Sequence, residues 1–92
     1  MADELGFEWD KANIEHILNH DVTPEEVELV FANDPLDVDY DVIDDEERWT
    51  VVGHTDRVRV LIVVFTMRHE AIRQITAYEA TKGMRQEYLK GL

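Results

Sequence analysis

The spacing of apolar residues changes abruptly at Asn33-Asp34-Pro35, and no other feature of the 92-residue chain constrains its fold as strongly. Before this point apolar residues recur at intervals of three or four, which is the period of an amphipathic helix. From residue 36 to residue 42 apolar and acidic residues alternate without a break, which is the period of a strand. Asparagine and aspartate followed by proline end a helix. The sequence therefore predicts an α+β chain in which helices come first and a sheet follows.

Two helices are predicted before this change of period. Asp10 is placed to cap the first helix, and Asn19-His20-Asp21 is placed to end it, because asparagine and aspartate tolerate the left-handed conformation that closes helices. The second helix has a more complete start signal. Thr23 supplies the cap, Pro24 occupies the first helical position, and Glu26 stands where a capping box requires an acid.

The rest of the chain predicts a sheet followed by a third helix. The expected strands are residues 36–42, 48–54, 58–67 and 71–79, and the expected helix is residues 82–90 behind a Thr81 cap. Short turns between successive strands imply an antiparallel meander with the helices packed on one face. The alternation in the first strand predicts one solvent-exposed face of acids. Ahead of the first helix, Phe7-Glu8-Trp9 is expected to form a brief strand or an anchoring arm.

The charge is divided unevenly along the chain. In total, 21 acidic and 9 basic residues give a formal charge of −12, which argues against a nucleic-acid partner because such partners usually require a basic surface. However, the first 47 residues hold 17 acids and one base, whereas the last 45 hold four acids and eight bases. The second half therefore leaves room for a face that binds anions. The alternatives are a solvated acidic surface that aids solubility and an acidic strand that mimics nucleic-acid phosphate.

Composition excludes several classes of protein. An apolar content of 45% fits one globular domain spanning residues 1–92. Without cysteine the chain has no disulfide framework and no thiolate metal site, which suits a cytoplasmic protein. No apolar run is long enough to cross a membrane, so no membrane partner is expected. His16 and His20 share a helix face, but no third or fourth ligand matches them, so neither a metal nor another cofactor is predicted.

The basic half holds the residue types that metal-independent RNA cleavage requires. In that reaction a base removes the 2′-OH proton, cations stabilise the extra charge on phosphorus, and an acid protonates the leaving oxygen. The candidate residues are Arg59, Arg73, Arg85, Lys82, His54, His69, Tyr78 and Tyr88. Each has a structural alternative, such as an arginine that pairs with acids across the sheet. These residues alone leave the function open.

The same residues also match a family pattern. The matching positions are Phe7-Glu8-Trp9-Asp10, Asn13, His16, His20, Val22-Thr23-Pro24-Glu25-Glu26-Val27, Gly53-His54-Thr55-Asp56, Arg59, Ile72-Arg73, Ala80-Thr81, Arg85 and Tyr88. In this order, and along nearly its whole length, the chain resembles the BrnT family of toxins. The resemblance implies a RelE-like fold with two N-terminal helices, a four-stranded antiparallel sheet and a C-terminal helix.

The resemblance further implies a type II toxin, an endoribonuclease that inhibits translation. Its implied partner is a small ribbon-helix-helix antitoxin of the BrnA kind, which binds and neutralises the toxin and represses their shared operon as part of a larger toxin–antitoxin assembly. By position, the functional basic cluster of the family falls on Arg59, Arg73 and Arg85, with His20 near the end of the first helix. We predict that catalysis uses these residues and Tyr78, and that Arg57, Lys82 and Tyr88 bind RNA.

Several positions depart from the family pattern, among them Glu79, which adds a repelling charge, and Gly83, Met84 and Gln86, which make the last helix less basic. Asp21 stands where the family usually has glycine, and Tyr78 stands where it typically has arginine. A phenol can donate a proton but cannot neutralise a phosphate. The alternative hypothesis is therefore a catalytically weak or inactive family member that serves as a binding module for a basic protein partner.

Overall fold

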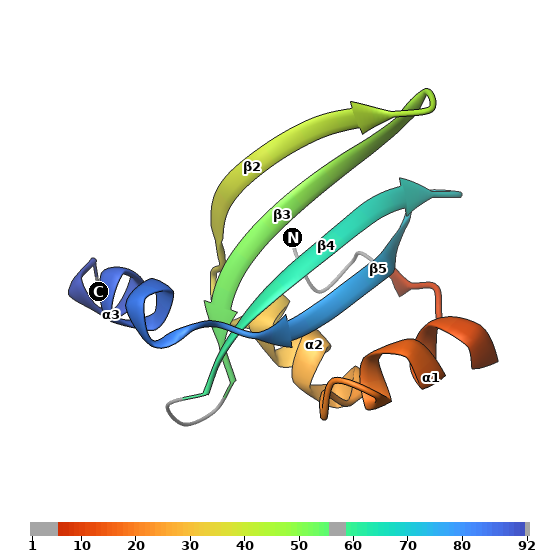
Figure 1. Cartoon of the computed structure of the whole chain (residues 1–92). Helices are drawn as coiled ribbons and strands as arrows, with labels where there is room; N and C mark the ends of the chain where they lie inside the picture. The colour runs from red at the N-terminus through yellow and green to blue at the C-terminus, as the bar shows by residue number, and fades with distance from the viewer. Residues whose placement is uncertain (1–5, 56–58, 92) are drawn as a thin grey trace.

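The computed structural model describes residues 6–55 and 59–91, within which three helices accompany one five-stranded sheet (Figure 1). In chain order the elements are β1 (Gly6–Phe7), α1 (Lys11–Leu18), α2 (Pro24–Ala32), β2 (Leu36–Ile43), β3 (Glu46–His54), β4 (Val60–Arg68), β5 (Ala71–Glu79) and α3 (Lys82–Lys90). The strands lie side by side in the order β1-β5-β4-β3-β2. None of the helices in these residues has the length and apolar character needed to cross a membrane. The predicted α+β class is confirmed.

Local capping interactions define both N-terminal helices, as predicted. The Asp10 side chain accepts a hydrogen bond from the Asn13 backbone N–H at 2.8 Å, and the Asn13 side chain accepts one from the Asp10 N–H at 2.8 Å. Thr23 and Glu26 form the equivalent reciprocal pair at the start of α2. A cap of this kind contributes about 1 kcal/mol to stability. The starts of α1 and α2 therefore follow from a few adjacent residues.

The sheet has one strand more than predicted, because the segment in front of α1 joins it. Gly6 and Phe7 pair in parallel with Ala71 and Ile72 of β5, so the expected four-stranded and fully antiparallel sheet is wrong in both respects. The Phe7 ring anchors this strand, since its centroid lies 5.6 Å from that of Phe31 on α2. β1 covers only the first two residues of β5, and α1 packs against β5 beyond them (Figure 1).

β2 is the other outer strand of the sheet, and both of its faces are open. All eight of its residues are exposed, so the prediction of a single solvent-exposed face is wrong. The cause is the position of β2 at the edge of the sheet, in a hairpin that the helices do not cover (Figure 1). The register of β2 also shifts between Asp37 and Asp39. Because the shift adds a residue to β2, Leu36 and Tyr40 lie on opposite faces of the sheet. The hairpin of β2 and β3 extends beyond the helices (Figure 1).

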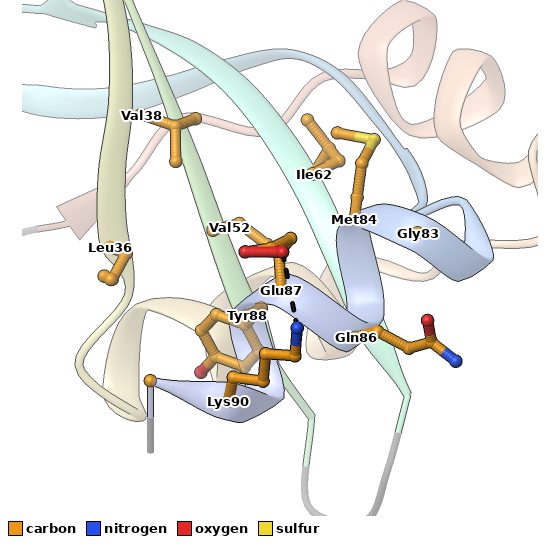
Figure 2. A pocket seen from close by; sticks show the side chains of 11 residues that line it. Leu36, Val38, Val52, Ile62, Gly83, Met84, Gln86, Glu87, Tyr88 and Lys90 are labelled. Carbon is orange, nitrogen blue, oxygen red and sulfur yellow. Dashed lines mark ion pairs between the residues drawn. The ribbon is translucent and has the colours of Figure 1, made fainter.

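α3 packs on the opposite face of the sheet from α1 and α2. Its Tyr88 side chain is buried among Val52, Val60 and Ile62, which alternate along β3 and β4 with residues that face the other helices. Figure 2 shows this side of the sheet, with Leu36 of β2 across from α3. The prediction that all helices pack on one face is therefore wrong. The continuous apolar run of β4 presents apolar side chains to both faces, so both faces need a cover.

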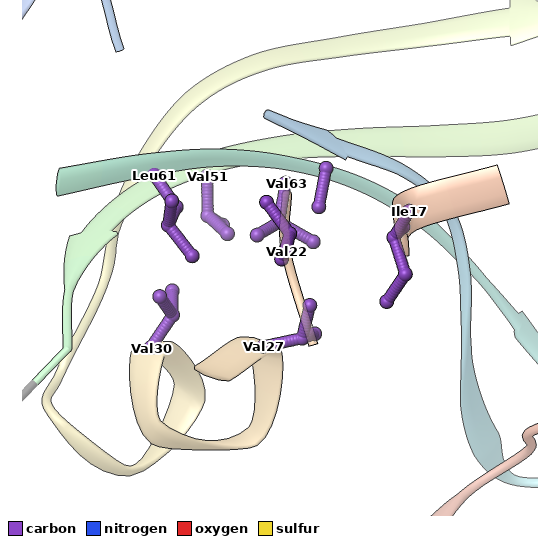
Figure 3. Close-up of a cluster of buried hydrophobic side chains, with 8 residues drawn as sticks. Ile17, Val22, Val27, Val30, Val51, Leu61 and Val63 are labelled. Carbon is purple, nitrogen blue, oxygen red and sulfur yellow. The ribbon is translucent and has the colours of Figure 1, made fainter. Parts of the chain in front are cut away.

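The main core lies between the sheet and the two N-terminal helices (Figure 3). Its buried side chains are Ile17, Val22, Val27, Val30, Val51, Leu61, Val63 and Ala77. Burial of one such aliphatic side chain contributes roughly 1.5–3 kcal/mol, so this layer supplies most of the hydrophobic stabilisation.

A glycine in β3 allows α2 to approach the sheet closely. A Cβ atom at Gly53 would lie 2.7 Å from Cγ1 of Val30 and 3.2 Å from Cβ of Pro35. We expect Gly53→Ala to lower the free energy of unfolding by about 1–3 kcal/mol, because packed neighbours must shift. Gly83→Ala is the matched control, since a Cβ there meets nothing within 4 Å and alanine favours the helix by roughly 0.5–1 kcal/mol. Urea unfolding measures both, and equal effects would contradict the close packing.

Candidate functional site

α1 lines the outer edge of β5, and the two elements match in spacing. Going along them, Asn13, His16 and His20 lie opposite Gln74, Thr76 and Tyr78, respectively. Intervals of three and four residues advance a helix by about 4.5–6 Å, and alternate residues of a strand advance by about 6.6 Å. Asn13 contacts the backbone oxygen of Gln74, and the side chains of His16 and His20 contact those of Thr76 and Tyr78.

Two histidines and a tyrosine meet along this edge. Nε2 of His16 lies 3.0 Å from Oγ1 of Thr76. The ring centroids of His16 and His20 are 5.3 Å apart, and those of His20 and Tyr78 are 6.4 Å apart. All three rings belong to exposed residues, so a ligand in solvent can reach their polar atoms. Within residues 6–55 and 59–91, no group of three or more histidine, cysteine, aspartate or glutamate side chains is arranged to hold a metal ion.

Arg59 binds the turn that follows His20. Its guanidinium donates hydrogen bonds to the backbone oxygen of Asp21 at 2.7 Å and to the Glu26 carboxylate at 2.6 Å. Its Nε also lies 3.7 Å from the Glu79 carboxylate. Asp21 directly follows His20 in the chain. Glu79 directly follows Tyr78, but their side chains lie on opposite faces of the sheet, because Glu79 pairs with Leu61 and Tyr78 with Ile62. We use the name His20 cluster for His16, His20, Thr76 and Tyr78, which contact one another, together with Arg59, which binds the backbone next to His20.

A left-handed residue directs the backbone of α1 toward Arg59. Asp21 has φ of 60°, a conformation that favours glycine and that aspartate also tolerates. The Asp21 N–H donates to the Leu18 oxygen and the Val22 N–H to the Ile17 oxygen, both at 3.0 Å, so the turn closes the helix. This position is the one to which the family resemblance assigns glycine. The substitution therefore keeps the turn that the glycine would make.

Neighbouring carboxylates offset the charge of Arg59. Burial opposes ionisation of Glu26, but hydrogen bonds from Arg59 and from the Thr23 backbone outweigh it, so the pKa of Glu26 lies below its ordinary 4.5. The same hydrogen bond raises the pKa of Arg59. A phosphate that approaches Arg59 must therefore compete with Glu26 and, less directly, with Glu79.

Arg73 is engaged in a second group of ion pairs. Its guanidinium lies 2.8 Å from the Asp10 carboxylate and 3.2 Å from that of Glu8. The hydrogen bond from the Asn13 backbone, followed by that from Arg73, holds the pKa of Asp10 below its ordinary value. Because Asp10 caps α1, Arg73 ties the start of that helix to β5.

The two paired arginines lie at opposite ends of the sheet. Arg73 is paired across strands with Thr66. Thr66 lies seven positions after Arg59 along extended chain, a distance of roughly 20 Å. The structure therefore does not bring Arg59 and Arg73 to one phosphate. His69 lies in the turn at the Arg73 end, where its side chain is 82% exposed and 3.5 Å from Glu8.

The predicted residues of α3 differ in their exposure. Lys82 is exposed and Arg85 is half-buried. Tyr88 is buried, and its hydroxyl has no hydrogen-bond partner among the residues that the structure describes. Burial raises the pKa of that hydroxyl. Tyr88 is thus part of the packing between α3 and the sheet, while Arg57 lies outside the described residues.

The site includes residues to which the sequence assigned no such role. His16 appeared there only as a candidate metal ligand, although its four-residue spacing from His20 is a signal that the two rings share a surface. Glu26 carries no signal of this kind. It is 33 residues from Arg59 in the chain, and only the folded sheet brings them together.

The ion pair between Arg59 and Glu26 predicts a pH-dependent stability. A carboxyl whose pKa is lowered on folding stabilises the folded state above its unfolded pKa, and this contribution is lost as the pH falls through the folded pKa. We expect Arg59→Met to lower the free energy of unfolding by about 1–2 kcal/mol at pH 7, and this difference to shrink as the pH falls below 4.5. Denaturant unfolding at several pH values measures it.

The matched control for this prediction is Lys90→Met. Lys90 also makes an ion pair, with Glu87 at 3.7 Å, but both side chains are at least 75% exposed. Lys90→Met should therefore change the free energy of unfolding little at any pH. A loss on Arg59→Met that does not vary with pH would show that the ion pair is not its cause.

The model of one known protein family matches most of this chain. Residues 9–83 match the family described as ribonuclease toxin, BrnT, of type II toxin–antitoxin system. A search of curated proteins found no match. The matched segment includes Arg59, Arg73 and Tyr78 and ends before Arg85 and Tyr88. Because the match spans well over half of the chain, the protein belongs to the BrnT family of ribonuclease toxins of type II toxin–antitoxin systems.

Proposed function

We propose that this protein is a metal-independent endoribonuclease toxin that inhibits translation by cutting RNA, and that a cognate ribbon-helix-helix antitoxin neutralises it. The observation that carries the proposal is the contact of His20 with Tyr78, next to the turn that Arg59 binds, within the segment that matches ribonuclease toxins. The strand order and the position of α3 are also compatible with a RelE-like fold, which we propose as part of the same assignment.

The His20 cluster has groups suited to each step of RNA cleavage. In the proposed reaction the imidazole of His20 removes the proton of a 2′-OH, and the 2′-oxygen attacks the adjacent phosphorus. The bond from phosphorus to the 5′-oxygen breaks, and the Tyr78 hydroxyl protonates that leaving oxygen, which yields a 2′,3′-cyclic phosphate. Arg59 stabilises the negative charge that develops on the phosphoryl oxygens. His16 hydrogen-bonds Thr76 and holds its ring beside that of His20.

One observation favours a second candidate, a weakly active or inactive toxin that acts as a binding module for a basic protein. Arg59 and Arg73 both face carboxylates, so neither presents an uncompensated charge to RNA. The first 47 residues carry 17 of the 21 acids, which suits a basic partner. In this case the antitoxin interaction remains and the RNA chemistry is lost.

RNA cleavage by the purified protein distinguishes the two candidates. We expect cleavage to persist in EDTA, because none of the proposed steps uses a metal. We expect His20→Ala and Tyr78→Phe each to slow cleavage by about 10²–10⁴-fold, the usual contribution of a general acid or base. Neither change should alter the melting temperature, since both residues are exposed. Gel analysis of a 5′-labelled RNA measures the rate.

Matched controls for these variants are His69→Ala and Tyr40→Phe. Both residues are exposed, and neither belongs to the His20 cluster, so cleavage should continue at the unmodified rate. Cleavage that disappears in EDTA would contradict the metal-independent mechanism. An unmodified protein with no cleavage activity would leave the binding module as the function.

A further inference from the structure

The outer edge of β2 carries backbone donors that no other strand uses. The Tyr40 N–H donates to the Asp39 carboxylate at 2.9 Å, and the Val42 N–H donates to the Asp41 carboxylate at 2.8 Å. Residues two apart in a strand direct their N–H groups to the same side, and β2 has a neighbour on one side only. These two amides therefore point away from the sheet, and each donates to the carboxylate of the preceding aspartate.

The same edge exposes apolar side chains to solvent. Leu36, Val38, Tyr40 and Val42 are between 46% and 54% exposed. A groove of about 700 Å³ lies on the α3 face, between β2 and α3, where Leu36 and Val38 face Met84 (Figure 2). Tyr40 lies on the other face of the sheet. Exposed apolar residues that adjoin a groove on an open strand are typical of a surface that another chain covers.

The acids of β2 determine which kind of chain fits. Across the ladder Asp39 pairs with Thr50 and Asp41 with Arg48, so these two carboxylates lie on the α3 face, while Tyr40 lies on the other face. A strand added beside residues 39–42 would therefore meet acids on one face and apolar side chains on the other. Its complement is a segment in which basic and apolar residues alternate.

We propose that β2 binds a basic, extended segment of the antitoxin as an additional strand of the sheet, an inference that rests on the proposed antitoxin partner. Carbonyl oxygens of the added strand replace the carboxylates of Asp39 and Asp41 on the Tyr40 and Val42 amides. The released carboxylates then pair with lysine or arginine of the segment, and its apolar side chains cover β2. An apolar residue at one end of the segment fills the groove beside α3.

A second copy of this chain does not fit the same edge. Pairing β2 with β2 would bring the Asp39 and Asp41 carboxylates of two chains together, and like charges on neighbouring strands are destabilising. The acids therefore protect the edge against self-association while leaving it open to a basic strand. The charge of this edge therefore favours a basic partner over a homodimer.

The proposed segment anchors the antitoxin without covering the His20 cluster directly. β3 and β4 separate β2 from β5, and neighbouring strands are about 4.8 Å apart, so the two edges lie roughly 14 Å from each other. Antitoxin binding at β2 can therefore be measured independently of RNA cleavage. If the protein binds the segment but does not cut RNA, the proposed enzyme activity is wrong and the proposed binding surface is still supported.

Two synthetic hexapeptides test the inference on the full-length protein. One alternates lysine and valine, and the other has the same composition arranged as three lysines followed by three valines. We expect the alternating peptide to bind more tightly and to slow hydrogen exchange at the Tyr40 and Val42 amides. Titration calorimetry gives the affinity, and amide exchange followed by NMR locates the strand.

Matched variants separate strand pairing from general charge attraction. Asp39→Asn with Asp41→Asn should weaken binding of the alternating peptide roughly five- to tenfold, because two cross-strand charge pairs are lost. Asp44→Asn with Asp45→Asn removes the same charge from the adjoining turn, where φ of 53° and 65° suits asparagine, and should have a smaller effect.

Each alternative outcome would overturn the inference. Equal binding of the two peptides, or equal loss in the two double variants, would show nonspecific attraction by the acidic half. Absence of binding, or binding without protection of the Tyr40 and Val42 amides, would show that β2 does not accept a strand. A concentration-dependent dimer that protects these amides would show that a second copy occupies the edge.

Discussion

Two arginines hold α1 against the outer edge of β5, and the candidate site depends on that placement. Arg73 binds the carboxylate of Asp10, which caps the start of the helix. Arg59 binds the backbone oxygen of Asp21 just beyond the end of the helix, and its ion pair with Glu79 ties this contact to the end of β5. With both ends fixed, His20 faces Tyr78. The arginines that resemble a catalytic cluster in the sequence therefore also serve to position α1.

This arrangement changes the meaning of the charge distribution. Several acids of the first half bind arginines of the second half, so the acidic residues stabilise the fold as well as forming a solvated surface. The acids of β2 make no ion pair among those that the structure gives for the described residues, and they border an open strand edge. The molecule thus has a candidate RNA site at the β5 edge and an acidic, strand-accepting edge at β2. The proposed RNA cleavage and the proposed antitoxin binding would therefore use separate surfaces.

The sequence predicts the parts of this structure that depend on neighbouring residues. The caps at Asp10 and Thr23 act over three residues, and the helices they begin were predictable for that reason. The parallel pairing of β1 depends on the contact of Phe7 with Phe31 on α2, which is distant in the chain, so no local pattern reveals it. The shift in β2 reverses the faces of its side chains, and a simple alternation cannot show it. Similarly, individual residues of the site were candidates from the sequence, but their division between two ends of the sheet required the register of β4 and β5.

NMR mapping of the surface that binds RNA tests most directly whether the site lies at the His20 end of the sheet and not at the Arg73 end. A short RNA with 2′-O-methyl groups cannot be cut by attack of its 2′-oxygen, so it can be titrated into the unmodified protein. We expect chemical-shift changes to concentrate at His16, His20 and Tyr78, and at the turn around Asp21. The amides near Arg73 and His69 should be unaffected. Changes centred on Arg73 and His69 instead would contradict the assignment of the site to the His20 cluster.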